Sequence, residues 1–336
     1  MSTIRIGLMG FGRIGRQIYR LAHEDPDIEV VAVSDVGRPE ILHHLLTRTM
    51  RQAEVRLEGN YLISNRGRTR MLSGNLPAEV PWDVFDVDVV IDATSKFKSI
   101  AALQPHIDNG ARRVITSVLP EEGIDRVILF GVNNQDADAS DRIISAGSAS
   151  TTATALALKT ITSRWNIEHA SMTSVHAYTS DQSLQDLAGP DYRRSRSGAE
   201  NIIPNHTPAL QWVQHVMPEL DGKMTAYALN VPVQTGSLVD LTLVFSDPDI
   251  SVEAVNACFA DAEKAMPELI ATTTDPIVSS DVTGFRTSML VDLDGTIKAG
   301  ERTIKLLAWH ETLGHARRIL DVVHLYSQLD SRREAA

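Results

Sequence analysis

A glycine-rich turn between an apolar run and a helical pattern constrains the fold of this chain more than any other feature. The turn occupies residues 10–15 (Gly-Phe-Gly-Arg-Ile-Gly), directly after the apolar run that starts at residue 4. Apolar residues with helical spacing follow at 16–24. In such a turn Gly10 permits the tight bend, Gly12 lets the backbone approach a phosphate group, and Gly15 lets the helix pack on the strand. The sequence therefore predicts a strand–turn–helix unit of a parallel α/β sheet.

An acidic residue at the end of the second predicted strand fits the same unit. Asp35 closes the run 29–35, 20 residues after Gly15. A carboxylate there accepts hydrogen bonds from the ribose hydroxyls of a dinucleotide and repels a 2′-phosphate. The pattern predicts NAD binding and disfavours NADP, although Arg38 is a nearby cation that would weaken the preference. The alternative is an ordinary tight turn without a ligand. The contacts expected from the fingerprint are Gly10, Gly12, Arg13, Ile14, Gly15 and Asp35.

Strand and helix patterns continue to alternate through the first half. Further apolar runs lie at 87–94, 111–118 and 141–147. Alternation of this kind predicts a Rossmann-type, doubly wound parallel sheet. Two of the runs end in hydroxyl side chains, at the edge where such a sheet places its ligand crevice. These hydroxyls have two alternative interpretations, contact with the cofactor or capping of a helix. The residues are Thr94, Ser95, Thr116 and Ser117.

The pattern changes after about residue 167. Runs at 167–179, 231–245 and 286–310 alternate in part between apolar and polar residues, and turn signals such as Asp294-Gly295 interrupt them. This is typical of an antiparallel sheet with one covered face. An amphipathic helix follows at 314–329.

A chain of 336 residues is long enough for two domains. We expect a Rossmann domain at 1–148, with the C-terminal helix (313–333) packing back on it, and an α+β domain with an antiparallel sheet at 149–312.

Composition excludes several classes of partner. The net charge of −11 argues against nucleic acid. No apolar run reaches the roughly 20 residues of a membrane span. The single cysteine, Cys258, excludes an intrachain disulfide, and no signal-peptide pattern opens the chain, so we expect a cytoplasmic protein.

Several short blocks now point to one family. With the N-terminal turn, the sequence resembles phosphorylating glyceraldehyde-3-phosphate dehydrogenase in the order and spacing of these blocks over nearly its whole length. The resemblance implies NAD as cofactor, a small-molecule substrate that is phosphorylated in the family, and a homotetramer. The blocks are 174–182, 200–204, 218–226, 231–242 and 279–285.

The family uses a cysteine thiolate to attack an aldehyde, with a histidine that assists hydride transfer. His176 matches that histidine, although a lone histidine in a strand is usually structural. Counting back from Lys159 places Ala149 at the cysteine's position, and a one-residue gap would place Ser150 there. A serine needs a neighbouring base before it can act as a nucleophile. Cys258 lies in a predicted helix at 251–266, which indicates a packing role.

Other departures lie in the regions that resemble the family's anion sites. Asn230 stands where the family has an arginine, and no clear match to a C-terminal asparagine occurs in 309–315. Arginines at 193, 194 and 196 have two interpretations, an anion site or a solvated, subunit-contacting loop. The positions that the resemblance implies for anion binding are Ser148, Thr179, Asp181, Arg196 and Thr207.

No metal site is expected. His310 and His315 suggest a zinc helix, but five residues of helix separate two side chains by about 140°.

Two functions from different classes follow. The first is a thiol-independent NAD oxidoreductase acting on an aldehyde or alcohol, with His176 as general acid or base. The second is a catalytically silent NAD-binding paralogue with a regulatory or scaffold role. A third possibility is that Ala149 replaces a native cysteine.

Overall fold

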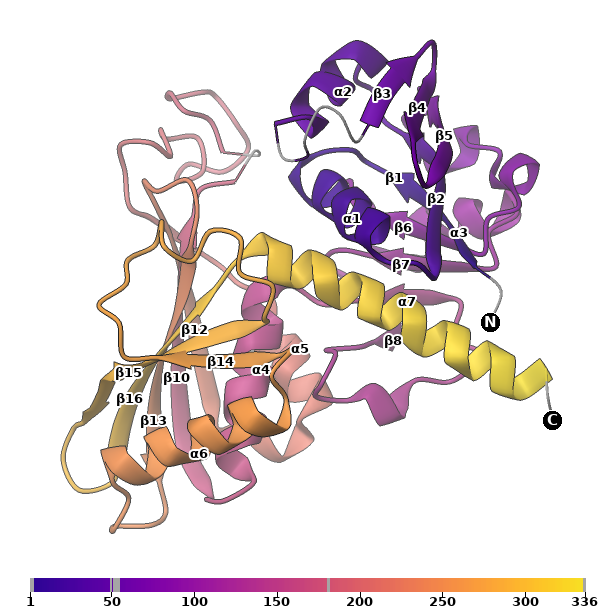
Figure 1. Cartoon of the computed structure of the whole chain (residues 1–336). Helices are drawn as coiled ribbons and strands as arrows, with labels where there is room; N and C mark the ends of the chain where they lie inside the picture. The colour runs from indigo at the N-terminus through magenta and orange to yellow at the C-terminus, as the bar shows by residue number, and fades with distance from the viewer. Residues whose placement is uncertain (1–2, 49, 51–54, 180–181, 335–336) are drawn as a thin grey trace. The chain divides into compact units, whose positions relative to one another are not determined.

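The computed structural model describes residues 3–48, 50, 55–179 and 182–334 (Figure 1). The chain divides into two compact units. The first unit contains the residues up to Gly147 together with those from Ala316 onward, and the second contains Ser148–His315.

Within the described residues, the first unit contains a nine-stranded sheet in the order β3-β4-β5-β2-β1-β6-β7-β9-β8. All neighbours from β5 to β8 are parallel, and β3, β4 and β5 pair antiparallel at one edge. The predicted parallel Rossmann-type sheet is confirmed. Its strands are β1 (Ile4–Met9), β2 (Ile28–Ser34), β3 (Val55–Glu58), β4 (Tyr61–Ser64), β5 (Gly67–Leu72), β6 (Val89–Asp92), β7 (Arg113–Thr116), β8 (Arg126–Val127) and β9 (Ile143–Ser145).

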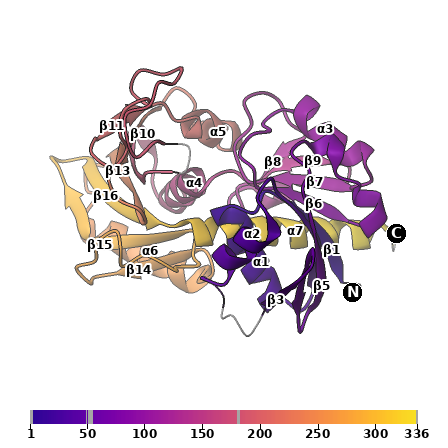
Figure 2. The same cartoon turned by 90° about the horizontal axis from the view of Figure 1, so that it is seen from above.

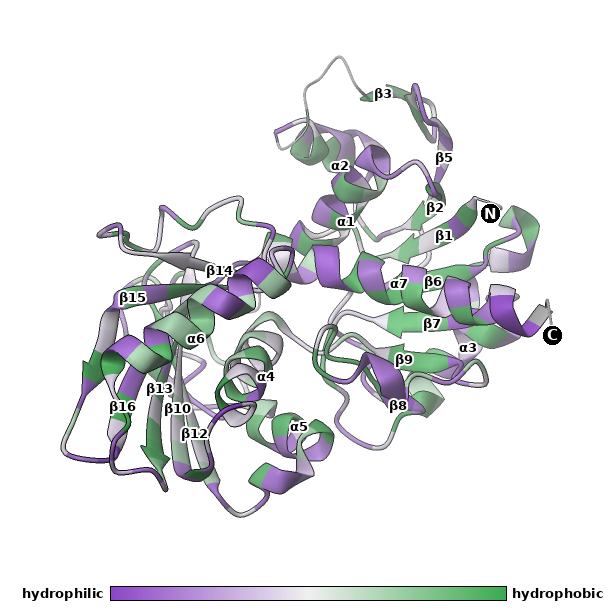
Figure 3. Cartoon of the chain, turned by 60° about the horizontal axis from the view of Figure 1, so that its bottom comes forward, coloured by the Kyte–Doolittle hydropathy of each residue, from purple (hydrophilic) through white to green (hydrophobic). Residues whose placement is uncertain are grey.

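The central strands of this sheet are buried along nearly their whole length, as in a parallel sheet covered on both faces. Figure 3 shows the hydrophobic character of β7 and β9 in green. The helices of this unit are α1 (Arg13–Glu24), α2 (Pro39–Leu46), α3 (Ile100–Asp108), the single turns η1 (Pro77–Glu79), η2 (Trp82–Phe85) and η3 (Asn134–Asp136), and most of α7 (Thr312–Glu334).

Polar side chains fix α7 to the first unit. Arg113 on β7 donates from Nη1 to Asp330 Oδ2 at 2.7 Å, and its guanidinium lies 4.6 Å from the centre of the Tyr326 ring. The Tyr326 hydroxyl donates to Asp141 at 2.7 Å, and burial, followed by this carboxylate, raises the pKa of the phenol. Hydrogen bonds thus reinforce an otherwise apolar packing of the C-terminal helix.

The second unit contains, within the described residues, a seven-stranded sheet in the order β11-β12-β10-β13-β16-β15-β14. It is mainly antiparallel, but β10 and β12 pair in parallel, as do β14 and β15. Figure 2 shows this sheet with α4 and α5 nearby. The elements are α4 (Ala149–Thr162), β10 (Ile167–Ala177), β11 (Ile203–Asn205), α5 (Ala209–Val216), η4 (Pro218–Leu220), β12 (Met224–Val231), β13 (Ser237–Phe245), α6 (Val252–Ala265), β14 (Ile270–Thr273), β15 (Met289–Lys298) and β16 (Thr303–His310).

Two local sequence interpretations in this unit need correction. Asp294-Gly295 is not the hairpin turn, because both residues lie inside β15. There the Gly295 amide donates to Asp292 Oδ1 at 2.9 Å, and the strand register shifts, as in a bulge. The turn lies at 299–302 instead, with Gly300 at φ 75°. The run 231–245 likewise combines the end of β12, a turn and β13.

Candidate functional site

The glycine turn of the first unit combines tight packing with one open position. Gly10 has φ 90°, and a Cβ there would lie 2.8 Å from the Ala93 carbonyl carbon. A Cβ at Gly15 would lie 2.1 Å from the Gly10 oxygen. At Gly12, in contrast, a Cβ would meet nothing within 4 Å. Gly12 also caps α1 without a side-chain hydrogen bond, and a helix start of this kind suits an anion.

Asp35 is held in a fixed orientation next to this turn. Its Oδ2 accepts a hydrogen bond from the Phe11 amide at 2.6 Å, and its Oδ1 accepts one from the Gly37 amide at 2.8 Å. Each carboxylate oxygen has a second acceptor position, so the half-buried side chain can still accept from ribose hydroxyls. Arg16, which sequence reasoning missed, donates from Nη1 to the Phe11 carbonyl at 2.9 Å and braces the turn.

The residues with hydroxyl side chains after β6 and β7 differ in their local contacts. Asp92 Oδ1 accepts from both the amide and the hydroxyl of Thr94, at 3.0 and 2.7 Å. Ser95 follows in the left-handed region at φ 62°, an uncommon conformation for a residue other than glycine. The Ser117 amide donates to the Asp92 carbonyl at 2.9 Å. Within the described residues the buried Thr116 hydroxyl has no hydrogen-bond partner.

A buried polar chain behind this turn was also missed by sequence reasoning. The Trp82 indole N–H donates to His106 Nδ1 at 2.9 Å, and His106 Nε2 lies 3.3 Å from Asp92 Oδ2. Because the indole can only donate, His106 accepts at Nδ1 and therefore donates from Nε2 to Asp92. The chain fixes Asp92, which in turn holds the Thr94 turn. All three side chains are fully buried.

In the second unit, α4 begins where the family's cysteine is expected. Ser148 is the N-cap and accepts from the Thr151 amide at 3.3 Å, and Ala149 is the first helical residue. Ser150 Oγ lies 3.4 Å from Ser148 Oγ and has no described hydrogen bond to a histidine. Residues 148–150 are half-buried. The helix therefore starts with small side chains, and the described hydrogen bonds of its first hydroxyls are with one another and with the Thr151 amide.

His176 stands near the end of β10 with its ring fixed at one nitrogen. Nδ1 lies 2.6 Å from the Ala177 carbonyl oxygen, which can only accept, so Nδ1 carries the proton. Nε2 has a lone pair and no hydrogen bond to another described residue. The side chain is half-buried. This arrangement leaves one nitrogen available for proton transfer.

A second histidine lies beside His176. The rings of His176 and His310, at the end of β16, have centroids 6.2 Å apart. His310 is 4% exposed, and its burial, followed by the positions of His176 and His315, lowers its pKa to about 3. Among the described residues its Nε2 has no hydrogen-bond partner. His310 and His315 do not lie on one helix, because His310 ends a strand and His315 lies in α7.

Asn230 belongs to the same region. It is the register partner of His176 on the neighbouring strand β12. Its Nδ2 donates to Gln182 Oε1 at 2.6 Å, and its Oδ1 lies 3.4 Å from Asn205 Nδ2. The Thr179 amide lies 3.3 Å from the same Gln182 oxygen. The structure therefore brings His176, Thr179 and Asn230 together.

Two of the other predicted anion ligands make local contacts within the second unit. Arg196 Nε pairs with Asp186 Oδ2 at 2.9 Å in an exposed loop. The Thr207 hydroxyl accepts from the Ala209 amide at 3.1 Å, at the start of α5. Asp181 lies outside the described residues. Cys258 on α6 is buried, and burial raises the pKa of its thiol, so no thiolate is available there.

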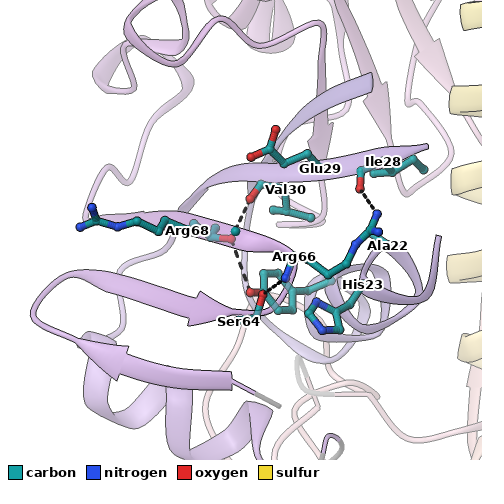
Figure 4. Close-up of a pocket in the computed structure, with 11 residues that line it drawn as sticks. Ala22, His23, Ile28, Glu29, Val30, Ser64, Arg66 and Arg68 are labelled. Carbon is teal, nitrogen blue, oxygen red and sulfur yellow. Dashed lines mark hydrogen bonds between the residues drawn. The ribbon is translucent and has the colours of Figure 1, made fainter. Parts of the chain in front are cut away.

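Figure 4 shows a surface hollow elsewhere in the first unit. It lies between α1, the start of β2 and the hairpin of β4 and β5, and it contains none of the predicted site residues. Its buried hydroxyls are satisfied internally, because Tyr19 contacts Thr69 and Thr69 donates to the Val30 carbonyl at 2.7 Å. The lining residues are Tyr19, Ala22, His23, Ile28, Glu29, Val30, Ser64, Arg66, Gly67, Arg68 and Thr69.

Two searches of the described part of the chain found no further class of site. None of its helices is both long enough and apolar enough to cross a bilayer. No group of three or more histidine, cysteine, aspartate or glutamate side chains in that part is placed to hold a metal ion.

A dinucleotide-binding turn in a parallel sheet, together with a histidine-bearing sheet in a second unit, is typical of the two-unit NAD-dependent dehydrogenases. Comparison with known families gives the particular class. Residues 4–100 match the model described as glyceraldehyde 3-phosphate dehydrogenase, NAD binding domain, and residues 148–312 match its C-terminal domain. The chain therefore belongs to the glyceraldehyde-3-phosphate dehydrogenase family, and its cofactor is NAD.

Individual relatives agree over nearly the whole length. The chain is 38% identical to a glyceraldehyde-3-phosphate dehydrogenase of Kitasatospora aureofaciens over 328 residues, which cover 96% of this chain and 98% of the relative. It is 35% identical to glyceraldehyde-3-phosphate dehydrogenase 1 of Bacillus subtilis over 327 residues, covering 95% and 97%. A relative from Mycobacterium tuberculosis is 38% identical over 336 residues, covering 96% and 98%.

Proposed function

We propose that this protein is a thiol-independent NAD oxidoreductase in which His176 is the general acid or base for an aldehyde or alcohol substrate. The observation that carries the proposal is the state of His176. Its Nδ1 is hydrogen-bonded to the Ala177 carbonyl, while Nε2 has no hydrogen bond to another described residue and the side chain is half-buried. An imidazole with one nitrogen hydrogen-bonded and the other unbonded can give or accept one proton.

The absence of a thiolate limits the chemistry to this class. Ala149 starts α4, Ser150 has no described base beside it, and the only cysteine is buried in α6. A thioester therefore has no sulfur nucleophile here, and the oxygen ester that a serine hydroxyl would form instead needs a partner base. Reduction of a carbonyl or oxidation of an alcohol requires only proton transfer from this chain and a hydride partner.

The cofactor site fits NAD by its shape and its donors. The open space over Gly12, the uncapped start of α1 and the fixed Asp35 carboxylate suit a pyrophosphate and a ribose. Bound NAD supplies the hydride donor or acceptor. The residues we assign to this site are Gly10, Gly12, Arg13, Ile14, Gly15, Asp35, Thr94, Ser95 and Ser117.

Domain roles and assembly complete the proposal. We assign residues 1–148 with α7 to cofactor binding and 149–312 to substrate binding and catalysis.

Large apolar side chains are exposed in and after the loop that follows β10, which supports a homotetramer in which other copies cover them. These are Leu184, Leu187, Tyr192 and Ile202, with exposed fractions of 59, 66, 96 and 65%. The acidic net charge and single cysteine support a cytoplasmic location.

The test is NADH oxidation with a panel of small aldehydes and phosphorylated sugars, including glyceraldehyde and its 3-phosphate. We expect saturable turnover that falls by about 10²–10⁴-fold in His176→Asn, with NADH affinity nearly unchanged. His169→Asn is the matched control, because His169 is an exposed histidine of the same strand. Equal loss in both variants would make His176 structural. NADH binding without turnover on any substrate would instead establish the silent paralogue.

A further inference from the structure

The inference concerns the chemical class of the substrate and starts from strand register. His176 and Asn230 are register partners in the parallel pair β10 and β12. Neighbouring strands lie about 4.8 Å apart, and paired residues present their side chains on the same face. A substrate group that contacts His176 therefore lies beside Asn230.

The side chains behind Asn230 form a directional chain of amides. Asn205 donates to Asn230, and Asn230 donates to Gln182 Oε1 at 2.6 Å. The orientation of Gln182 is fixed independently, because the Thr179 backbone N–H can only donate and lies 3.3 Å from that same oxygen. The Gln182 amide nitrogen is thus the free end of the chain.

That free end is a buried donor without an acceptor. Gln182 is 5% exposed, and within the described residues its Nε2 has no hydrogen-bond partner. Buried polar groups are almost always paired, so an unpaired donor needs an acceptor from elsewhere. A ligand oxygen beside His176 and Asn230 would supply it.

The charge of the side chains around Gln182 determines which kind of ligand oxygen can bind there. None of the described contacts of His176, Asn230 or Gln182 is with a cationic side chain. Burial keeps the His310 ring beside them neutral at pH 7. Arg196 is paired with Asp186. Desolvating a phosphate against amides alone is unfavourable, whereas a hydroxyl or carbonyl oxygen needs no countercharge.

We propose that the substrate group bound beside His176 is uncharged, with Gln182 Nε2 as its donor, so that the preferred substrates are small unphosphorylated aldehydes and polyols. The inference rests on the proposed function, because it takes the surroundings of His176 as the substrate site. Asn230 and Gln182 are then the residues that determine specificity against phosphate.

The experiment measures binding without turnover. Protein saturated with NADH is titrated with glycerol and with glycerol 3-phosphate, and dissociation constants are taken from saturation-transfer NMR. Neither alcohol can be oxidised while the cofactor is reduced. We expect the parent protein to bind glycerol about tenfold more tightly than glycerol 3-phosphate. Gln182→Leu should weaken the binding of glycerol by about tenfold. Asn230→Arg should reverse the preference, so that glycerol 3-phosphate binds more tightly than glycerol.

Controls and contrary outcomes separate this inference from the proposed function. Gln214→Leu removes a half-buried glutamine elsewhere in the unit, and Asn166→Arg adds a cation at an exposed site of the same unit. Tighter or equal binding of glycerol 3-phosphate by the parent protein overturns the inference, as does an unchanged preference in folded Asn230→Arg. The parent comparison stands even if Gln182→Leu does not fold. Preferential glycerol binding without NADH oxidation by any aldehyde refutes the proposed activity alone.

Discussion

Replacing His310 by phenylalanine should make the protein less sensitive to acid. His310 is buried in the β16 end of the second-unit sheet, and burial lowers the pKa of its imidazole to about 3. The unfolded chain exposes this group, whose ordinary pKa is about 6.5. Between these two values the unfolded state binds a proton that the folded state does not. Stability is therefore unaffected above pH 6.5 and falls as the pH drops below it.

The magnitude follows from the size of that difference. Each pH unit below 6.5 costs about 1.4 kcal/mol until the folded pKa is approached. Between pH 7.5 and 5.0 the loss attributable to His310 is about 2 kcal/mol. Phenylalanine removes the titrating group and fills much of the same volume, so the variant should lose about 2 kcal/mol less than the parent over this interval.

The assay is urea unfolding of both proteins at pH 7.5, 6.5, 5.5 and 5.0, with the difference in unfolding free energy compared across pH. His169→Phe is the control, because that exposed ring is solvated in folded and unfolded chains alike, and it should keep the pH dependence of the parent. Parallel curves for the parent and His310→Phe would refute the reasoning that His310 is held neutral by burial.

Three further predictions test the sites. Asp35→Asn should weaken NAD binding by about 10- to 100-fold and reduce the difference in affinity between NAD and NADP, because one charge-assisted acceptor is lost. Calorimetry with both cofactors measures the two affinities. Gly12→Val should abolish NADH binding with little change in melting temperature, whereas Gly15→Val should lower the melting temperature strongly, since a Cβ there meets the Gly10 oxygen. Ala149→Cys should restore little phosphate-dependent oxidation of glyceraldehyde 3-phosphate, and Ala149→Cys with Asn230→Arg should restore more; equal rates would show that residue 230 does not govern phosphate use.

Local patterns predicted the cofactor-binding half of the molecule well. The glycine turn is readable from sequence because each glycine answers a local steric demand, such as the approach of Gly15 to the Gly10 oxygen. The position of Asp35 is also predictable from local pattern, since the residue comes directly after the end of β2. The buried Trp82–His106–Asp92 chain was not, because it joins three separate elements whose packing no short pattern encodes.

The surroundings of His176 depend on sheet register, which sequence periodicity does not give. His176 is the register partner of Asn230, which lies over 50 residues later in the chain. The pairing of β10 with β13, and of β13 with β16, brings His310 to the same part of the sheet. A one-residue slip would turn any of these side chains to the other face. The same limit explains why Asp294-Gly295 was read as a turn, although the strand absorbs it as a bulge.

The missing thiol and the neutral surroundings of His176 fit one another physically. Thioester chemistry needs a stabilised thiolate and, afterwards, a bound phosphate, so both steps place negative charge in the site. Here His310 is kept uncharged, Asn230 and Gln182 are amides, and α4 begins with Ala149. None of the described contacts of His176 is with a cationic side chain. A proton transfer between an imidazole and an alcohol oxygen creates only a transient charge that the same ring neutralises, and that step remains feasible in such surroundings.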